Sequence, residues 1–185
     1  MRVRPYAGWE AYTEIMDSLD DPRSKAMLDN MRYHGKYECL QDPTIFETLV
    51  PVPEYRFYSC FDNAVLTNME QVQKFYYDLW DSNSSLFEVR IDHCATADWG
   101  VACDGEWYQQ VPGKALIDAG NNDVEADAFY LSHAHLSWFF PFHEVDGKLL
   151  LGGEICYVDE ANATLDKLDP ADVLTLEEAK ASWHD

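Results

Sequence analysis

Residues 127–143, DAFYLSHAHLSWFFPFH, and 148–158, KLLLGGEICYV, contain the pattern that decides the fold. Apolar and polar side chains alternate along both stretches, which is typical of strands with one buried face. Asp146-Gly147 lies between them and is a hairpin turn signal, so we expect the two strands to pair. The same period-two pattern occurs over 86–96 and 99–109. The second half of the chain therefore predicts a meandering sheet.

The first half of the chain carries helical patterns instead. Apolar side chains recur at helical spacing from Trp9 to Leu19, and Asp21-Pro22 supplies an N-cap followed by a proline at the first helical position. The elements expected next are a helix to about Leu40, a short helix after Asp42-Pro43, a strand over 54–60 and a helix opened by the capping box Thr67-x-x-Glu70. Helices first and a sheet second predict the α+β class, with a curved mixed or antiparallel sheet wrapped around the N-terminal helices.

The length of 185 residues is enough for one domain with a full core and too short for two. We expect a single domain over 1–185 with its core at about 8–158. A curved sheet wrapped around helices forms a cone with an apolar opening. The remaining segment, 159–185, is acidic but contains several leucines, so we expect it to pack as a terminal helix, or lid, over that opening. Aromatic residues make up 14% of the chain and would line an apolar pocket there.

Charge and targeting patterns exclude several classes of partner. The chain has 34 acidic and 13 basic residues, and a field of that sign repels phosphate backbones and anionic lipid headgroups. We therefore expect neither nucleic acid nor membrane as a partner. The first thirty residues contain no uninterrupted apolar run, so they predict neither a secretory signal nor a spanning helix. We expect a cytoplasmic protein.

Cofactor and metal motifs are weak in this sequence. The five cysteines include no C-x-x-C pair and are interpreted as small buried hydrophobes, and no G-x-G-x-x-G, P-loop or G-x-S-x-G motif is present. His133-x-His135 would point two imidazoles to one face of a strand, as in some metal sites, but the next carboxylate, Glu144, lies too far along for cupin-like spacing. We favour imidazoles packed at a sheet face or subunit contact, and expect neither cofactor nor metal.

Four residues have the chemistry of an acid-base pocket: Tyr37 and Glu38 on the second helix, Tyr58 at the end of a strand and His93 on the strand at 86–96. Taken alone, each has an ordinary explanation as a packed tyrosine, a solvated carboxylate or a core histidine. Together they are the side chains needed to polarise a carbonyl or phenol and move a proton. Alternation places His93 on the strand face shared by the apolar residues Phe87, Val89 and Ile91.

These residues resemble, over roughly 25–158, the pattern of scytalone dehydratase and its relatives in the NTF2-like, SnoaL-like superfamily of cone-shaped α+β folds. Tyr37-Glu38 is similar to that family's Tyr-Asp pair, Tyr58 to its second catalytic tyrosine and His93 to its catalytic histidine. The run from His133-Ala134-His135 to Asp146-Gly147 is similar to the family's His-Ala-His strand and Asp-Gly turn. The resemblance implies that Tyr37, Glu38, Tyr58 and His93 are catalytic and that the protein is a homo-oligomer, a trimer or a dimer.

The departures from the family pattern concern the substrate. Leu136 and Trp138 stand where the family has a serine and an asparagine that contact substrate, and the stretch 106–110 offers glutamine where the family has a second pocket histidine. The resemblance therefore implies a changed substrate, bound by five residues: Tyr33, His34, Gln110, Leu136 and Trp138. Alternation that points Leu136 and Trp138 inward places His133 and His135 on the opposite face of the sheet.

We therefore expect a cofactor-independent lyase acting on a small aromatic or phenolic substrate. His93 would be the principal base or acid, Tyr37 and Tyr58 would orient water or bind the developing oxyanion, and Glu38 would protonate a departing hydroxyl. The outcome is either dehydration or, as in the superfamily's deformylating lyases, hydroxyl loss to a quinone methide followed by formaldehyde release from a lignin-derived diarylpropane. The apolar side chains of Leu136 and Trp138 slightly favour the two-ring substrate.

Two other classes of function stay open. Many NTF2-like domains bind hydrophobic ligands or partner subunits without chemistry. The superfamily also includes ketosteroid isomerases and epoxide hydrolases, and the Asp-Arg-Asp arrangement of the hydrolases has only a weak counterpart in Arg90 and Asp92.

Overall fold

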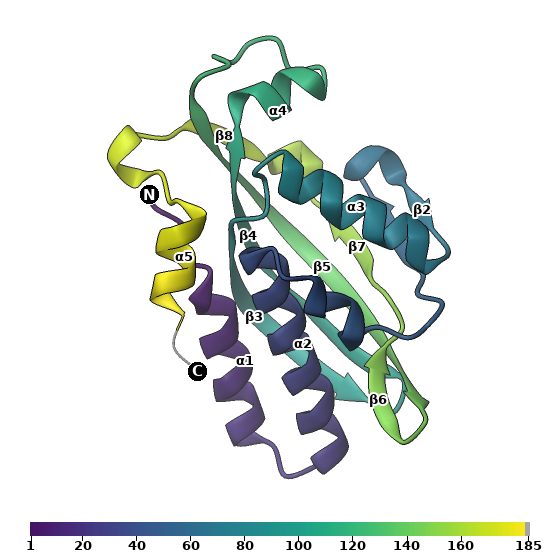
Figure 1. Ribbon diagram of the computed structural model, residues 1–185. Coiled ribbons are helices and arrows are strands. Elements are labelled where there is room, and N and C mark those ends of the chain that lie inside the picture. Colours follow the sequence, from purple (N-terminus) through teal and green to yellow (C-terminus); the bar gives the residue numbers. More distant parts are fainter. Residues whose placement is uncertain (184–185) are drawn as a thin grey trace.

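The computed structural model describes residues 1–183 and has one eight-stranded mixed sheet with helices packed on one face (Figure 1). The strand order is β2-β1-β7-β5-β4-β3, and β6 and β8 also pair with β5. The strand bounds are β1 Tyr55–Tyr58, β2 Val65–Leu66, β3 Phe87–Ala97, β4 Gly100–Pro112, β5 Phe129–Val145, β6 Lys148–Leu151, β7 Ile155–Val158 and β8 Thr164–Lys167. β1 runs parallel to β7, whereas the other strand pairs are antiparallel. The predicted α+β class is confirmed.

Three long helices cover one face of this sheet: α1 (Tyr6–Ser18), α2 (Pro22–Leu40) and α3 (Met69–Asp81) (Figure 1). The predicted start of α2 is confirmed, because the Asp21 carboxylate accepts a hydrogen bond from the Ser24 backbone N–H at 2.8 Å. α3 is capped by Asn68 rather than by Thr67, since the Asn68 side chain accepts from the Gln71 N–H. The shorter helices are η1 Pro43–Thr48, η2 Phe61–Asn63, α4 Gly113–Asp118, η3 Glu160–Asn162, η4 Pro170–Asp172 and α5 Leu176–Ser182.

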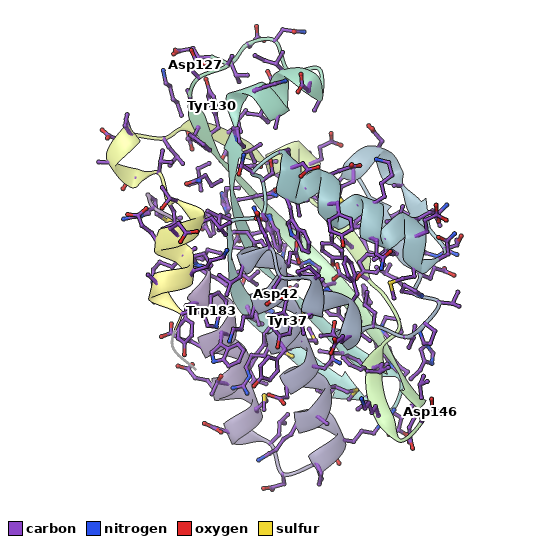
Figure 2. The ribbon with its side chains drawn as sticks, in the orientation of Figure 1. Tyr37, Asp42, Asp127, Tyr130, Asp146 and Trp183 are labelled. Carbon is purple, nitrogen blue, oxygen red and sulfur yellow. The ribbon has the colours of Figure 1, made fainter. Side chains whose placement is uncertain are left out.

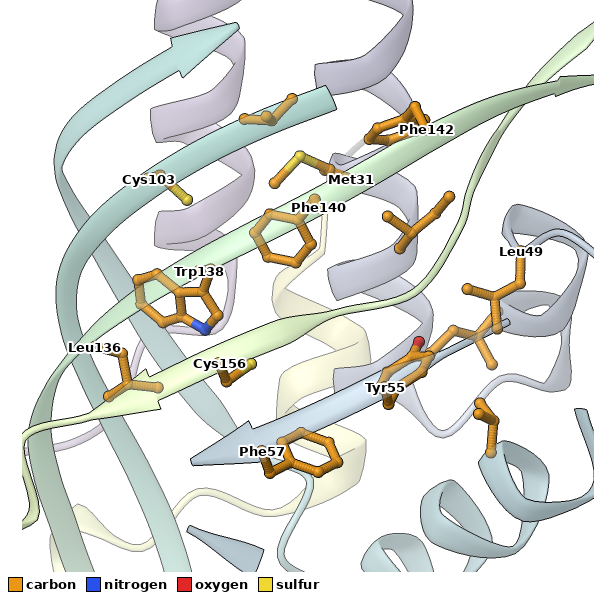
Figure 3. Packing of buried hydrophobic residues seen from close by; sticks show 14 of the residues in the cluster. Met31, Leu49, Tyr55, Phe57, Cys103, Leu136, Trp138, Phe140, Phe142 and Cys156 are labelled. Carbon is orange, nitrogen blue, oxygen red and sulfur yellow. The ribbon is translucent and has the colours of Figure 1, made fainter. Parts of the chain in front are cut away.

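The core lies between the inner face of the sheet and the long helices. Along β5, Leu136, Trp138 and Phe140 are buried, whereas Phe139 between them is exposed, so the alternation predicted for this strand is confirmed. Trp138 pairs in register with Cys103 on β4 and Cys156 on β7, and Figure 3 shows these three side chains in one row across the sheet. This apolar row forms the floor of the space that the helices enclose.

A β-bulge interrupts the pairing of β3 with β4. Ile91 pairs with Gly105 and His93 pairs with Asp104, so Asp92 is an extra residue without a partner on β4. At Gly105 a Cβ atom would lie 1.9 Å from the backbone oxygen of Arg90, and only glycine permits this close approach. The extra residue inverts the inward and outward alternation along the rest of β3.

The hairpin predicted at Asp146-Gly147 is confirmed. Both residues have positive φ, 51° and 75°, as a two-residue turn of type I′ requires, and they join β5 to β6. Within residues 1–183, no helix is both long and apolar enough to cross a lipid bilayer.

Besides the pairing of β8 with β5, a buried amide holds the C-terminal segment to the sheet. The Gln110 side chain donates to the backbone oxygen of Leu174 at 2.9 Å and accepts from the Leu174 N–H at 2.8 Å. α5 then begins with a capping box formed by Thr175 and Glu178 and buries Ala179 completely. Beyond α5, the Trp183 ring meets the edges of Tyr6 and Trp9 of the α1 region, which brings the end of the described chain beside α1 (Figure 2).

Candidate active site

The site is a cavity of about 200 Å³ between the inner face of the sheet and helices α1, α2 and α3. Most of its wall is apolar, and aromatic rings dominate the wall, including Trp9, Phe57, Phe75, Trp107, Trp138 and Trp183. The polar side chains that reach the cavity include Glu38 and His34 from α2, Tyr76 from α3 and Glu154 from the loop before β7. An apolar cavity with a few convergent polar groups has the composition of a small-molecule site.

Glu38 and His34 reach the cavity from the same face of α2. They are four residues apart, and residues at this spacing are neighbours on a helix surface. Protein atoms surround the Glu38 carboxyl group, and this burial, together with the negative charge of Glu154, raises the pKa of Glu38 well above its usual range. Both effects favour the protonated form of Glu38, so its carboxyl group can donate a proton at a higher pH than an exposed glutamate could.

Glu154 is placed by the two glycines before it. Gly153 has φ of +134°, and a Cβ atom there would lie 1.9 Å from the backbone oxygen of Glu54. The chain can therefore pass close to Glu54 and turn the Glu154 side chain inward, where 15% of it is exposed. One Glu154 carboxylate oxygen, Oε1, lies 3.2 Å from His34 Nε2.

His34 has a defined tautomer because its neighbour Thr48 has only one hydroxyl proton to donate. The Thr48 hydroxyl donates to the backbone oxygen of Ile45 at 2.5 Å, so at 2.7 Å it must accept from His34 Nδ1–H. His34 Nε2 then faces Glu154 Oε1, the two atoms being 3.2 Å apart. An imidazole beside a carboxylate is a common arrangement for a general base, and in this cavity His34 and Glu154 provide it.

Two buried tyrosines extend this network. The Tyr76 hydroxyl lies 2.9 Å from His34 Nε2 and 3.1 Å from the Tyr55 hydroxyl. Burial, reinforced by the charge of Glu154, raises the pKa of both phenols well above their usual range. Tyr55 and Tyr76 therefore stay protonated and can act as hydrogen-bond donors, but not as bases.

His93 lies on the opposite face of the sheet from the cavity. Its side chain is 84% exposed, and Nδ1 lies 2.9 Å from Asp104 Oδ1. The expected position beside Phe87, Val89 and Ile91 is corrected by the bulge at Asp92, which turns His93 outward and brings Cys94 to the inner face. Gly105 was the available signal, since an isolated glycine within a strand pattern indicates a bulge or a close backbone approach.

Tyr58 and Tyr37 also lie away from the cavity lining found within residues 1–183. On β1 the inward side chains are Tyr55 and Phe57, so Tyr58 points outward and stacks on Tyr157 with ring centroids 4.5 Å apart. Tyr37, labelled on α2 in Figure 2, is rotated about 100° from Glu38 around the helix and stacks on Tyr33. The four residues proposed as catalytic therefore do not converge, and Glu38 is the one that reaches the cavity.

Of the five residues expected to bind substrate, three line the cavity and two lie outside it. His34, Leu136 and Trp138 line the cavity. Tyr33 instead packs against the Trp9 ring, with centroids 5.1 Å apart, and Gln110 holds the C-terminal segment through Leu174. Tyr33 and Gln110 thus support the walls of the cavity from outside it.

Sequence reasoning missed Glu154, Tyr76, Tyr55 and Thr48. Gly152-Gly153 directly before Glu154 was a usable signal, because paired glycines inside a strand region mark a close backbone approach. Tyr76 lies on the apolar face of α3 and was indistinguishable from a packing residue. Tyr55 differs from Tyr58 in orientation alone, which depends on how the short strand β1 meets β7.

Comparison with known proteins identifies the fold. No protein-family model matches the chain, and a search of curated proteins finds no relative. Among solved structures, a SnoaL-like polyketide cyclase from Shewanella denitrificans OS-217 has a TM-score of 0.56 at 11% identity, over 72% of this chain and 90% of the other. One from Jannaschia sp. CCS1 has a TM-score of 0.51 at 13% identity, over 76% and 90%. One from Shewanella putrefaciens CN-32 has a TM-score of 0.52 at 11% identity, over 82% and 88%. These likenesses confirm the expected NTF2-like cone fold.

Proposed function

We propose that this protein is a cofactor-independent lyase that removes a hydroxyl group, as water, from a small aromatic or enolisable substrate bound in the cavity. The observation that carries this proposal is that Glu38, whose pKa is raised by burial and by the charge of Glu154, lines the same apolar cavity as His34 and Glu154, which lie 3.2 Å apart. Two titratable groups whose environments separate their protonation states can act as acid and base in one reaction.

The elimination needs one proton donated and one accepted. Glu38 donates its proton to the departing hydroxyl, which leaves as water with the electron pair of the C–O bond. The His34 and Glu154 pair takes the proton from the adjacent carbon, and the electrons of that C–H bond form the new double bond. The Tyr76 hydroxyl stabilises negative charge on a substrate carbonyl or phenol oxygen. Proton transfer from the pair back to Glu38, directly or through water, completes the cycle.

The cavity volume favours a substrate with one aromatic ring. A closed apolar cavity of about 150 Å³ holds benzene, and this cavity is about 200 Å³. A diarylpropane has two rings and would need more room than a cavity of this volume offers. We therefore propose dehydration of a single-ring substrate as the main reaction, with formaldehyde release from a two-ring diarylpropane as the second outcome. In either case α5 and Trp183 serve as the lid.

The two alternative functions are a ligand-binding protein and a hydrolase. A hydrophobic-ligand binder would use the same aromatic wall without turnover. The hydrolase arrangement has lost its support, because Arg90 donates to Glu88 at 2.8 Å and lies over the Tyr108 ring on the outer face. The binding alternative is distinguished by experiment.

The test is turnover of two probes, a single-ring β-hydroxy aryl ketone and a diaryl propanediol. Enone absorbance reports dehydration, and a formaldehyde assay reports the second outcome. Glu38→Gln and Glu154→Gln are each expected to lower kcat by about 10²- to 10⁴-fold, the usual contribution of a general acid or base. Glu144→Gln, on the exposed part of β5, is the matched control and should retain full activity. Binding of both probes without product, unchanged in Glu38→Gln, would establish the binding protein instead.

A further inference from the structure

A second cluster of chemically active side chains lies on the outer face of the sheet, opposite the cavity. Asp92 on β3, Glu106 on β4 and His135 on β5 each offer one ligand atom, and these three atoms lie within 4.8 Å of one another. The cluster differs from a simple acidic patch because an imidazole is one of its three members and two more imidazoles adjoin it, those of His93 and His133. None of these side chains takes part in the reaction proposed above.

The backbone places the three side chains together. Glu106 and His135 are direct cross-strand partners, so their side chains stand on the same face about one strand spacing apart. Asp92 is the extra residue of the β3 bulge, and both it and His93 are exposed on the outer side. Without the bulge, strict alternation would allow only one of two consecutive residues to face outward. The irregularity thus directs one more carboxylate toward the Glu106 and His135 pair.

Hydrogen bonds already orient the two partners. Glu106 Oε1 lies 3.2 Å from His135 Nδ1, while Glu106 Oε2 lies 2.5 Å from Nε2 of His133. The His133 ring is itself stacked on Tyr108, with centroids 4.3 Å apart and planes within 4°. Outer-sphere contacts of this kind fix the orientation of ligating carboxylates. His135 Nε2 also lies 3.6 Å from Asp104 Oδ2, so both ring nitrogens face carboxylates.

The local charge is negative. Carboxylates surround His135: Glu106 lies 3.2 Å from Nδ1 and Asp104 lies 3.6 Å from Nε2, and Asp92 is the third acidic side chain of the group. The nearby cation, Arg90, is cross-strand to Glu106 but forms its ion pair with Glu88 at 2.8 Å. A divalent cation would neutralise more of this charge than the protonated imidazole does.

We propose that Asp92, Glu106 and His135 bind one divalent transition-metal ion on the outer face of the sheet. Mixed imidazole and carboxylate ligands suit Zn²⁺ and its first-row neighbours, at about 2.0–2.2 Å from the metal. The three side chains lie at the surface, so they can close from their present spread onto an ion by small rotations. His133 orients Glu106 through its hydrogen bond to Glu106 Oε2. Water completes the coordination shell. The site is independent of the proposed reaction, because the sheet separates it from the cavity.

Zinc titration of the untagged protein tests this site. Calorimetry and metal analysis after dialysis are expected to show one Zn²⁺ per chain, with affinity that rises from pH 6 to pH 8 because the metal displaces the imidazole proton. Glu106→Gln and His135→Asn should each weaken binding at least tenfold. Asp92→Asn, at an exposed position, should weaken it as well and is the variant least able to disturb the fold.

The matched controls are His143→Asn and Glu144→Gln, which lie further along β5 and outside the cluster. Both should bind zinc like the wild-type protein. Cobalt substitution distinguishes these ligands from the cysteines, since the proposed site gives no thiolate-to-cobalt charge-transfer band. Absence of saturable binding would overturn the proposal, as would equal affinity in the wild-type protein and in all three cluster variants, or a thiolate band in the cobalt spectrum.

Discussion

Replacing Glu38 with glutamine is expected to stabilise the protein above pH 5 while lowering kcat by about 10²- to 10⁴-fold. Glutamine has nearly the shape of a neutral glutamic acid but never ionises. In the unfolded chain Glu38 loses its proton near the ordinary pKa of 4.5, whereas burial and the charge of Glu154 keep the folded form protonated to higher pH. The unfolded state therefore binds fewer protons in this window, and the wild-type free energy of unfolding falls as the pH rises.

The size of this effect follows from proton linkage. One proton contributes at most about 1.4 kcal/mol per pH unit. Between pH 5 and pH 7, the stability difference between Glu38→Gln and the wild type should therefore grow by up to about 2.7 kcal/mol. The growth stops once the pH passes the folded-state pKa. Because the Glu154 charge contributes to the raised pKa, the growth should end at a lower pH when both proteins also carry Glu154→Gln.

Urea unfolding followed by far-ultraviolet circular dichroism, at half-unit steps from pH 4 to pH 8, measures this difference directly. Glu144→Gln, an exposed carboxylate, is the control and should give a difference that does not change with pH. A Glu38→Gln difference that is equally flat from pH 4.5 to pH 7.5 would show that Glu38 ionises normally. That result would remove Glu38 as the proton donor and refute the proposed mechanism.

Three further substitutions test the placement of the remaining residues. His93→Ala should keep kcat within about twofold of the wild type, because it removes one exposed side chain and no general acid or base; a loss of a hundredfold or more in the enone assay would return His93 to the mechanism. Tyr76→Phe removes the hydroxyl that His34 and Tyr55 share as a partner. The free energy of unfolding, measured with urea, should fall by about 1–3 kcal/mol, and kcat should fall as well. Unchanged stability and rate would contradict the network. Gly153→Ala should lower the free energy of unfolding by more than about 1 kcal/mol, because its Cβ would meet Glu54 at 1.9 Å; a variant with wild-type stability and activity would show that Glu154 does not depend on this close approach.

Local sequence signals predicted the elements well and the site only in part. The cap at Asp21, the hairpin at Asp146-Gly147 and the alternation around Trp138 each depend on residues that are neighbours in the chain or on one strand. The spacing of four residues between His34 and Glu38 puts them on one face of α2, but periodicity alone did not separate them from Tyr37, which does not line the cavity. The orientation of His93 failed because alternation assumes an unbroken register, and the bulge adds one residue.

The sequence by itself determined the class of fold, the order of its elements and a set of aromatic residues suited to line a pocket, because periodicity and capping act over a few residues. Only the tertiary structure decided which acid-base groups meet. Glu38 and His34 come from α2, Tyr76 from α3 and Glu154 from the loop before β7, and their convergence depends on how the sheet curves beneath the helices. That geometry is set by long-range strand register and close backbone contacts at Gly105 and Gly153, whose consequences no local pattern contains.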